Sequence, residues 1–207
     1  NFLDSHNDVH IDGIWDVSIK DQKNKLYYII NHDLEIGKVV AYPNNVEAFV
    51  KTMTWEQLGQ PYTGKTQALI FKVLLTEATN KDALYAFMEN APVENSVRMR
   101  YISTTLCIND DSPDFKQEYE NFYKYLAVIA NKDDAMDRGY FWAVTEAAIH
   151  KEGSAVLFGS NEATPILYTD PQESSQDDNK SDPPLSSQQK TETKEKVEAE
   201  SVIFNLI

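Results

Sequence analysis

The sequence predicts a mixed α+β fold, built as one domain over residues 1–168. Within that range strand-like segments outnumber helical ones, and the helical segments lie between strand groups that are not neighbours in the sequence. This order favours an α+β domain over a repeating βαβ unit. Hydrophobic residues make up 42% of the 207 residues, which is enough to form a sizeable core.

Short apolar runs and apolar–polar alternation predict the strands. In the first strand, for example, Trp15, Val17 and Ile19 alternate with polar residues. The predicted strands are residues 15–19, 26–30, 36–40, 68–75, 97–108, 140–149 and 155–158.

Apolar spacing and capping residues predict three helices, which are Val46–Leu58, Lys81–Glu89 and Pro113–Asn131. In the first helix, apolar residues recur at i, i+3, i+4 and i+7, and Gly59 follows as a stop signal. Asn80 is a suitable N-cap for the second helix. Ser112 caps the third helix, which has proline at its first position and a stripe of large apolar side chains.

The composition changes abruptly after Tyr168. Residues 169–200 are almost entirely polar or charged, with proline interspersed, so they cannot bury enough apolar surface to offset the entropy of ordering. We therefore expect a disordered acidic and polar linker over 169–200. The apolar end, 201–207, is interpreted either as a frayed last helical turn or as a docking segment.

The charge balance narrows the possible partners. The chain has 33 acidic residues against 19 Lys and Arg, a net charge of −14. Such a chain is poorly suited to phosphate backbones or anionic membrane surfaces, and no apolar run approaches the ~20 residues of a membrane span. The single Cys107 excludes an intrachain disulfide and a cysteine-rich zinc module, so we expect a soluble protein of a reducing compartment.

One segment matches a phosphate-binding pattern. Residues 59–66 read G-x-x-x-x-G-K-T, but that motif requires a strand before it and a helix after it. Here the predicted order is inverted, and Pro61 removes a backbone donor from the loop. A polar connector is the favoured interpretation, and nucleotide binding stays open as an alternative.

A second cluster lies near the N-terminus. His6 and His10, four residues apart, stand among three aspartates and could share a metal ion if they were on one helix face. The surrounding sequence indicates a loop and a strand, so a solvated polar lead-in is favoured. We expect no metal and no cofactor.

Only four histidines are available for acid–base catalysis. They are His6, His10, His32 and His150. His32 follows a predicted buried strand, where it could stand at the rim of an active site or serve a structural role. These residues alone do not identify a nucleophile.

Several segments together resemble the prohead maturation proteases of tailed phages, a serine peptidase family related to herpesvirus assemblin. The similar segments are Asp4-Ser5-His6, Gly13-Ile14-Trp15-Asp16, 31–39 (NHDLEIGKV), 95–101 (NSVRMRY), 146–156 (EAAIHKEGSAV) and Gly159-Ser160-Asn161. They occur in order and span about residues 4–166.

The resemblance implies a fold and a site. The expected fold is a small β-barrel-like sheet wrapped by helices, similar to that of herpesvirus proteases. The resemblance implies Ser96 as nucleophile, His32 as its base and Glu152 as the third member. His150 is a rival for that third position, because the herpesvirus relatives use a histidine there.

The implied function is a serine endopeptidase that trims scaffold and major capsid protein precursors. It would act inside the assembling prohead, in the host cell cytoplasm, without nucleic acid or membrane as partner and with possible self-association. Two positions depart from the family pattern: Asn95 stands where histidine is frequent, and Arg98 stands where glycine is frequent. Arg98 could crowd the site or bring a cation to the developing negative charge. A catalytically inactive assembly protein on the same fold therefore remains an alternative.

Overall fold

The computed structural model describes residues 1–161, 163, 164, 166–168 and 201–206. The chain has a mixed α+β fold, as predicted, and its described strands form two sheets. The five-stranded sheet contains β1 (Asp8–His10), β7 (Tyr140–Val156), β2 (Tyr27–Ile30) and β3 (Val39–Ala41) in this order, with β6 (Glu94–Ile108) also paired to β7. The four-stranded sheet has the order β4 (Val46–Thr54), β5 (Lys65–Leu74), β9 (Ser201–Leu206) and β8 (Ile166–Tyr168).

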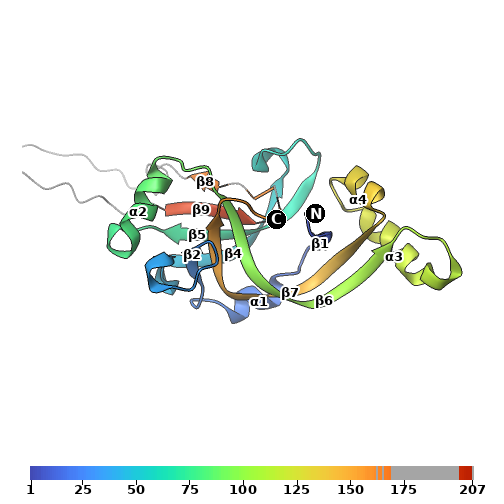
Figure 1. Cartoon of the computed structure of the whole chain (residues 1–207), viewed down its shortest axis with the longest axis horizontal. Coiled ribbons are helices and arrows are strands. Elements are labelled where there is room, and N and C mark those ends of the chain that lie inside the picture. The colour runs from blue at the N-terminus through green and yellow to red at the C-terminus, as the bar shows by residue number, and fades with distance from the viewer. Residues whose placement is uncertain (162, 165, 169–200, 207) are drawn as a thin grey trace, which may run out of the picture.

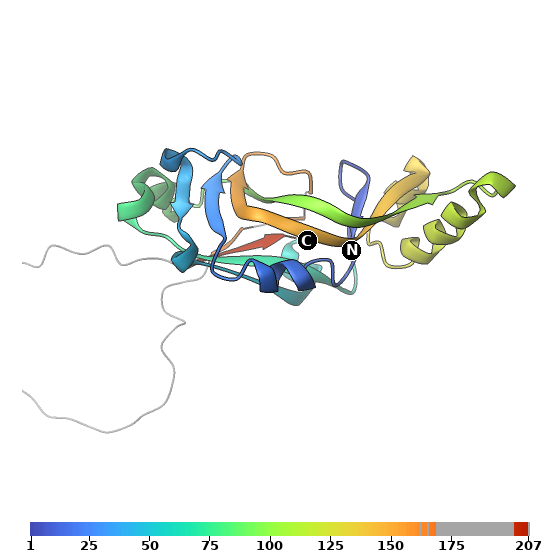
Figure 2. The same cartoon turned by 90° about the horizontal axis from the view of Figure 1, so that it is seen from below.

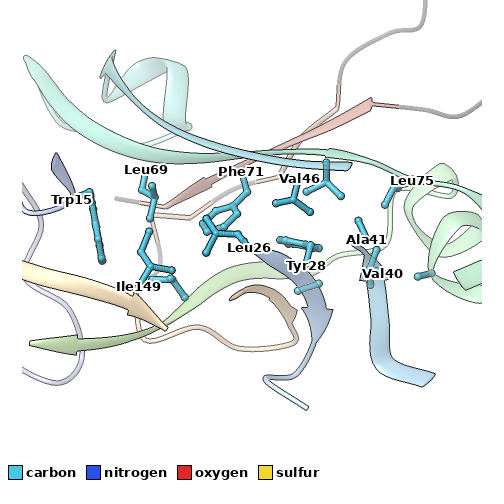
Figure 3. Packing of buried hydrophobic residues seen from close by; sticks show 14 of the residues in the cluster. Trp15, Leu26, Tyr28, Val40, Ala41, Val46, Leu69, Phe71, Leu75 and Ile149 are labelled. Atoms are coloured by element: carbon cyan, nitrogen blue, oxygen red, sulfur yellow. The ribbon is translucent and has the colours of Figure 1, made fainter. Parts of the chain in front are cut away.

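The two sheets face each other instead of closing into the expected barrel. Figure 2 shows them as two layers over the same part of the molecule. The main core lies between these layers, where Phe71 of β5 points toward Tyr28 of β2 (Figure 3). Their ring centroids are 6.2 Å apart, and both side chains are fully buried. Apolar burial between two sheets therefore provides the main stabilising contacts.

The strands β6 and β7 form a long antiparallel hairpin that extends beyond the two-layered part. Its far end carries α3 (Lys116–Leu126) and α4 (Lys132–Arg138), as Figure 1 shows. A second cluster of buried side chains lies there, with Phe122 of α3 against Phe141 of β7 at 5.1 Å between ring centroids. This cluster fixes α3 on one face of the hairpin.

Two sequence predictions of element type were wrong. Residues 46–58 form strand β4 followed by the short 3-10 turn Glu56–Leu58, because β4 pairs along its whole length with β5. Residues 16–21 form the short helix α1 (Asp16–Asp21) instead of a strand. In α1 the hydroxyl of Ser18 accepts the N–H of Ile149, which docks the helix on β7. In both segments, contacts with the rest of the fold outweighed the local sequence pattern: strand pairing with β5 in one, and docking on β7 in the other.

The remaining predictions are confirmed in type with shifted ends, except that Ile36–Lys38, predicted as part of a strand, form a 3-10 turn. The strand predictions at 26–30, 68–75 and 97–108 correspond to β2, β5 and β6, and the two at 140–149 and 155–158 merge into β7. Residues 36–40 form a 3-10 turn and then β3. The predicted helix Lys81–Glu89 coincides with the last part of α2 (Glu77–Met88) and runs one residue past its end; Asn80 is non-helical and accepts the N–H of Ala83 as a cap. The predicted helix Pro113–Asn131 is shorter, and α4 follows as a separate helix.

At the C-terminal end, the expected linker over 169–200 lies outside the described residues. Ser201–Leu206 form β9, which pairs antiparallel with β5 and with β8, so the frayed-helix interpretation is wrong. Whether this segment also docks on other subunits stays a prediction. In the part of the chain described by the structure, no helix has the length and apolar character needed to cross a membrane.

Candidate active site

Three neighbouring strands bring together the three residues that the resemblance implies. His32 follows the end of β2, Ser96 lies near the start of β6, and Glu152 lies in β7 between these two strands. The register places Ser96 opposite Ser154 of β7, while Tyr27 of β2 is opposite Glu152. Ser96, 64 positions after His32, and Glu152, 120 positions after it, therefore lie beside His32 at one end of the sheet.

The imidazole of His32 lies between the other two side chains. Its Nε2 is 2.8 Å from Ser96 Oγ, and its Nδ1 is 2.8 Å from Glu152 Oε1. With the proton on Nδ1, His32 donates to the carboxylate, and its Nε2 accepts the hydroxyl proton of Ser96. This arrangement can remove a proton from a serine hydroxyl during attack on a carbonyl carbon.

Glu152 owes its position to a local irregularity in β7. Val97 of β6 pairs with Gly153, but Met99 pairs with Ile149, so three residues of β7 stand opposite Arg98. Such bulges re-aim side chains in strands. Here the backbone takes a left-handed conformation at the residue before Glu152, with φ of 65° at Lys151. The Glu152 side chain is 1% exposed.

The same bulge gives different surroundings to Glu152 and to His150, the other candidate for the third position. His150 is exposed at the surface of β7, whereas Glu152 points inward and contacts His32. Ser154, two residues further along β7, donates its hydroxyl to Glu152 Oε2 at 2.9 Å. Geometry thus brings Glu152 and not His150 to the imidazole.

The backbone of His32 is held in an uncommon conformation. Its φ is 56°, in the left-handed region that non-glycine residues rarely adopt. Its N–H donates to Ser154 Oγ at 3.0 Å, and its carbonyl accepts Nη2 of Arg98 at 2.6 Å. Two hydrogen bonds from neighbouring strands therefore fix the main chain that carries the imidazole.

A cleft of about 410 Å³ opens beside Ser96. Its lining residues are Asp4, His6, His32, Ser96, Val97, Arg98, Met99, Tyr101 and Ser160. The first and the last segments of the resemblance, around His6 and Ser160, thus meet at the cleft. They are joined by a backbone hydrogen bond from Ser5 N–H to the Ser160 carbonyl.

Two buried acids lie at this cleft: Asp4 lines it, and Asp8 contacts the lining residue Tyr101. Oδ1 of Asp4 accepts the N–H groups of His6 and Asp8, and the hydroxyl of Tyr101 donates to Asp8 at 2.6 Å. Burial raises the pKa of both carboxyls above the ordinary value, because it disfavours their charged forms. Burial, together with the hydrogen bond to Asp8, also raises the pKa of the Tyr101 phenol.

Asn95, one of the two departures from the family pattern, is a structural anchor. Its side chain is buried, accepts the hydroxyl of Tyr28, and donates to the Thr164 carbonyl. These bonds tie the start of β6 to β2 directly beside Ser96. A histidine at this position is therefore not needed for the contacts that hold Ser96 in place.

Other candidate sites lack the geometry that their chemistry needs. The segment 59–66 leads into β5 instead of a helix, and Thr66, whose hydroxyl would meet magnesium in a phosphate loop, is 2% exposed. His10 ends the short strand β1, so His6 and His10 do not share a helix face. No group of three or more metal-binding side chains occurs among the described residues. Burial raises the pKa of Cys107 to about 11, which leaves little thiolate at neutral pH.

Sequence reasoning missed the contacts of Arg98 and Ser154. A usable signal existed, because residues i and i+2 of a strand lie on one face: Arg98 follows Ser96 and Ser154 follows Glu152 by two positions. The bulge that adds residues opposite Arg98 left no comparable signal. No protein-family model, curated protein or solved structure was found to match this chain.

Proposed function

We propose that the protein is a serine endopeptidase with Ser96 as nucleophile, His32 as general base and Glu152 as the group that orients His32. One observation carries the proposal: the His32 ring bridges Ser96 Oγ and Glu152 Oε1 with 2.8 Å on each side. A serine, a histidine and a carboxylate in this order are what acyl transfer by a serine triad requires.

In the proposed reaction, His32 takes the Ser96 proton as Oγ attacks the scissile carbonyl. The imidazolium then returns that proton to the leaving amine, and water releases the acyl group by the same route in reverse. Glu152 keeps the proton on Nδ1 and stabilises the imidazolium while it exists. Its burial strengthens this interaction, because little water screens the pair.

The surroundings of Ser96 suit an extended peptide. β6 pairs with β7 on one edge; on its second edge the N–H of Asn95 donates to the Thr164 carbonyl, and no other described strand pairs with the rest of that edge. The part of this edge beyond Asn95 can accept the main chain of a substrate as an added strand, and the cleft beside Ser96 can take side chains. These features support an endopeptidase over a hydrolase of small molecules.

The resemblance supplies the proposed substrates and setting. They are major capsid protein and scaffold precursors, trimmed inside the prohead in the host cytoplasm, by a chain related in fold to herpesvirus proteases. The net charge of −14 supports proteins over nucleic acid as partners. Self-association is part of the same proposal.

Incubation of the full chain with a purified capsid precursor tests this function. We expect the wild-type chain to cut the precursor and Ser96→Ala to leave it intact, as read by intact-mass spectrometry. Binding without cleavage by the wild-type chain would instead support an inactive assembly protein. Behaviour that depends on added nucleotide would favour the alternative that uses residues 59–66.

A further inference from the structure

The guanidinium of Arg98 contacts the backbone of the proposed base, His32, and the carboxylate of Glu152. Nη2 donates to the His32 carbonyl at 2.6 Å, and Nε lies 3.5 Å from Glu152 Oε1. We infer that Arg98 is a positioning residue that fixes the His32 backbone and offsets the charge of Glu152. This inference rests on the proposed function, and deepens it at a residue where the family pattern gives no role.

Strand geometry explains how Arg98 reaches these groups. Arg98 is two positions after Ser96 in β6, so the two side chains emerge on the same face of the sheet. The three-residue bulge of β7 stands opposite Arg98 and brings Glu152 into its reach. A glycine at position 98 would leave this space without a cation.

The first effect of Arg98 is on conformation. His32 has a φ of 56°, and this main chain is held by hydrogen bonds from Ser154 on one side and Arg98 on the other. A left-handed non-glycine residue persists only where its neighbours restrain it. Losing the Arg98 bond would let the imidazole move away from Ser96.

The second effect is electrostatic. Oε1 of Glu152 faces His32 Nδ1 and Arg98 Nε, while Oε2 accepts from Ser154. A cation beside the carboxylate disfavours a second positive charge on the imidazole, because like charges repel at short range. Arg98 therefore places a positive charge beside the carboxylate that also faces the imidazole.

Other titratable groups near the cleft are the same in every variant compared below. They are Asp4 and His6 from the N-terminal segment, Asp8 from β1 and Tyr101 from β6. A shift in the pH profile on changing Arg98 alone is thus attributable to its guanidinium.

The test measures the rate at which a fluorophosphonate labels Ser96, between pH 5 and 9. Arg98→Met should lower the maximal rate at least ~10-fold and move the pH midpoint upward by about half to one unit. Arg98→Lys should keep the midpoint near that of the wild type and lower the rate less. The matched control is Arg100→Met in the same strand, an exposed arginine whose replacement should change neither quantity.

Two further measurements separate the effect of the Arg98 charge from the effect of its packing. Added guanidine should restore part of the rate in Arg98→Met. Arg98→Gln, which keeps a donor but no charge, repeats the comparison if Arg98→Met does not fold, and should also show the raised midpoint.

An unchanged rate and midpoint in Arg98→Met or Arg98→Gln would overturn the inference while leaving the proposed function intact. A lower rate with an unmoved midpoint would overturn the electrostatic role. If the wild-type chain takes no label on Ser96, the proposed function fails, and this inference fails with it.

Discussion

Gly153 of β7 lies directly against the ring of Phe71 in the opposite sheet. A Cβ on Gly153 would stand 2.9 Å from Phe71 Cε1, closer than side-chain carbons normally approach. Phe71 is fully buried between the sheets and cannot swing aside into solvent (Figure 3). Because Gly153 separates Glu152 from Ser154, the packing of the two sheets and the alignment of the candidate site depend on the same residue.

We therefore expect Gly153→Ala to destabilise the protein by about 1–3 kcal/mol, the usual cost of overpacking a core. Denaturant unfolding followed by tryptophan fluorescence measures this. Gly37→Ala is the matched control, since no atom lies within 4 Å of a Cβ at Gly37, and it should cost much less. Equal stabilities of the two variants would argue against the close contact with Phe71.

The third member of the candidate site is tested by two substitutions in β7. Glu152→Gln should slow precursor cleavage by about 10²–10⁴-fold, because an amide can neither enforce the Nδ1 tautomer nor stabilise the imidazolium. His150→Ala should leave the rate unchanged, since His150 is exposed. The opposite ranking, with His150→Ala inactive and Glu152→Gln active, would assign the role to His150.

The buried Asp4 predicts a specific pH dependence of stability. Burial raises its pKa in the folded state above 3.8, so the folded state binds a proton more readily than the unfolded state. Ionised Asp4 thus costs stability at neutral pH, and the cost disappears as the pH falls toward 4.

Asp4→Asn should accordingly be more stable than the wild type at pH 7, with a gap that narrows toward pH 4. Thermal unfolding across this range measures the gap. The amide of the substituted side chain retains an oxygen for the N–H groups of His6 and Asp8, which makes the comparison one of charge. A gap that is constant with pH would contradict the assigned cause.

The pairing of β9 with β5 leads to another prediction. Six residues of β9 pair with β5, from Leu69 to Leu74. Removing residues 201–207 should lower the melting temperature, since it leaves the backbone edge of a core strand unpaired. Thermal unfolding of the shortened chain checks this, with sedimentation as a readout of self-association. An unchanged melting temperature would show that β9 adds nothing to the folded chain.

The sequence predicted the α+β class and most strands because these depend on local apolar patterns. The helix predicted at 46–58 was wrong. Its apolar residues fit helical spacing (Val46, Phe49, Val50 and Met53), but the segment pairs with β5 as a strand. The pairing with the next strand lies outside the short window in which the helical spacing was recognised. The strand assigned to 15–19 failed in the same way, since the docking of Ser18 on Ile149 is a tertiary contact.

The candidate site likewise has residues that the sequence predicts and contacts that it does not. An ordered set of weak motifs implies Ser96, His32 and Glu152, and the structure brings these three together. The sequence did not separate Glu152 from His150, because only the bulge of β7 turns one inward and leaves the other in solvent. The strand pattern places Arg98 on the same face as Ser96, but its contact with Glu152 depends on the same bulge, which left no signal in the sequence.

The central claim is that Ser96 and His32 act as one unit, and fluorophosphonate labelling of the full chain tests it most directly. We expect one adduct on the peptide that contains Ser96, formed faster as an imidazole loses its proton with rising pH. His32→Ala should slow the adduct by at least ~10³-fold, and in cleavage assays Ser96→Ala/His32→Ala should be no worse than either single variant. An adduct on another serine, no adduct at all, or a rate that is indifferent to His32→Ala would contradict the account.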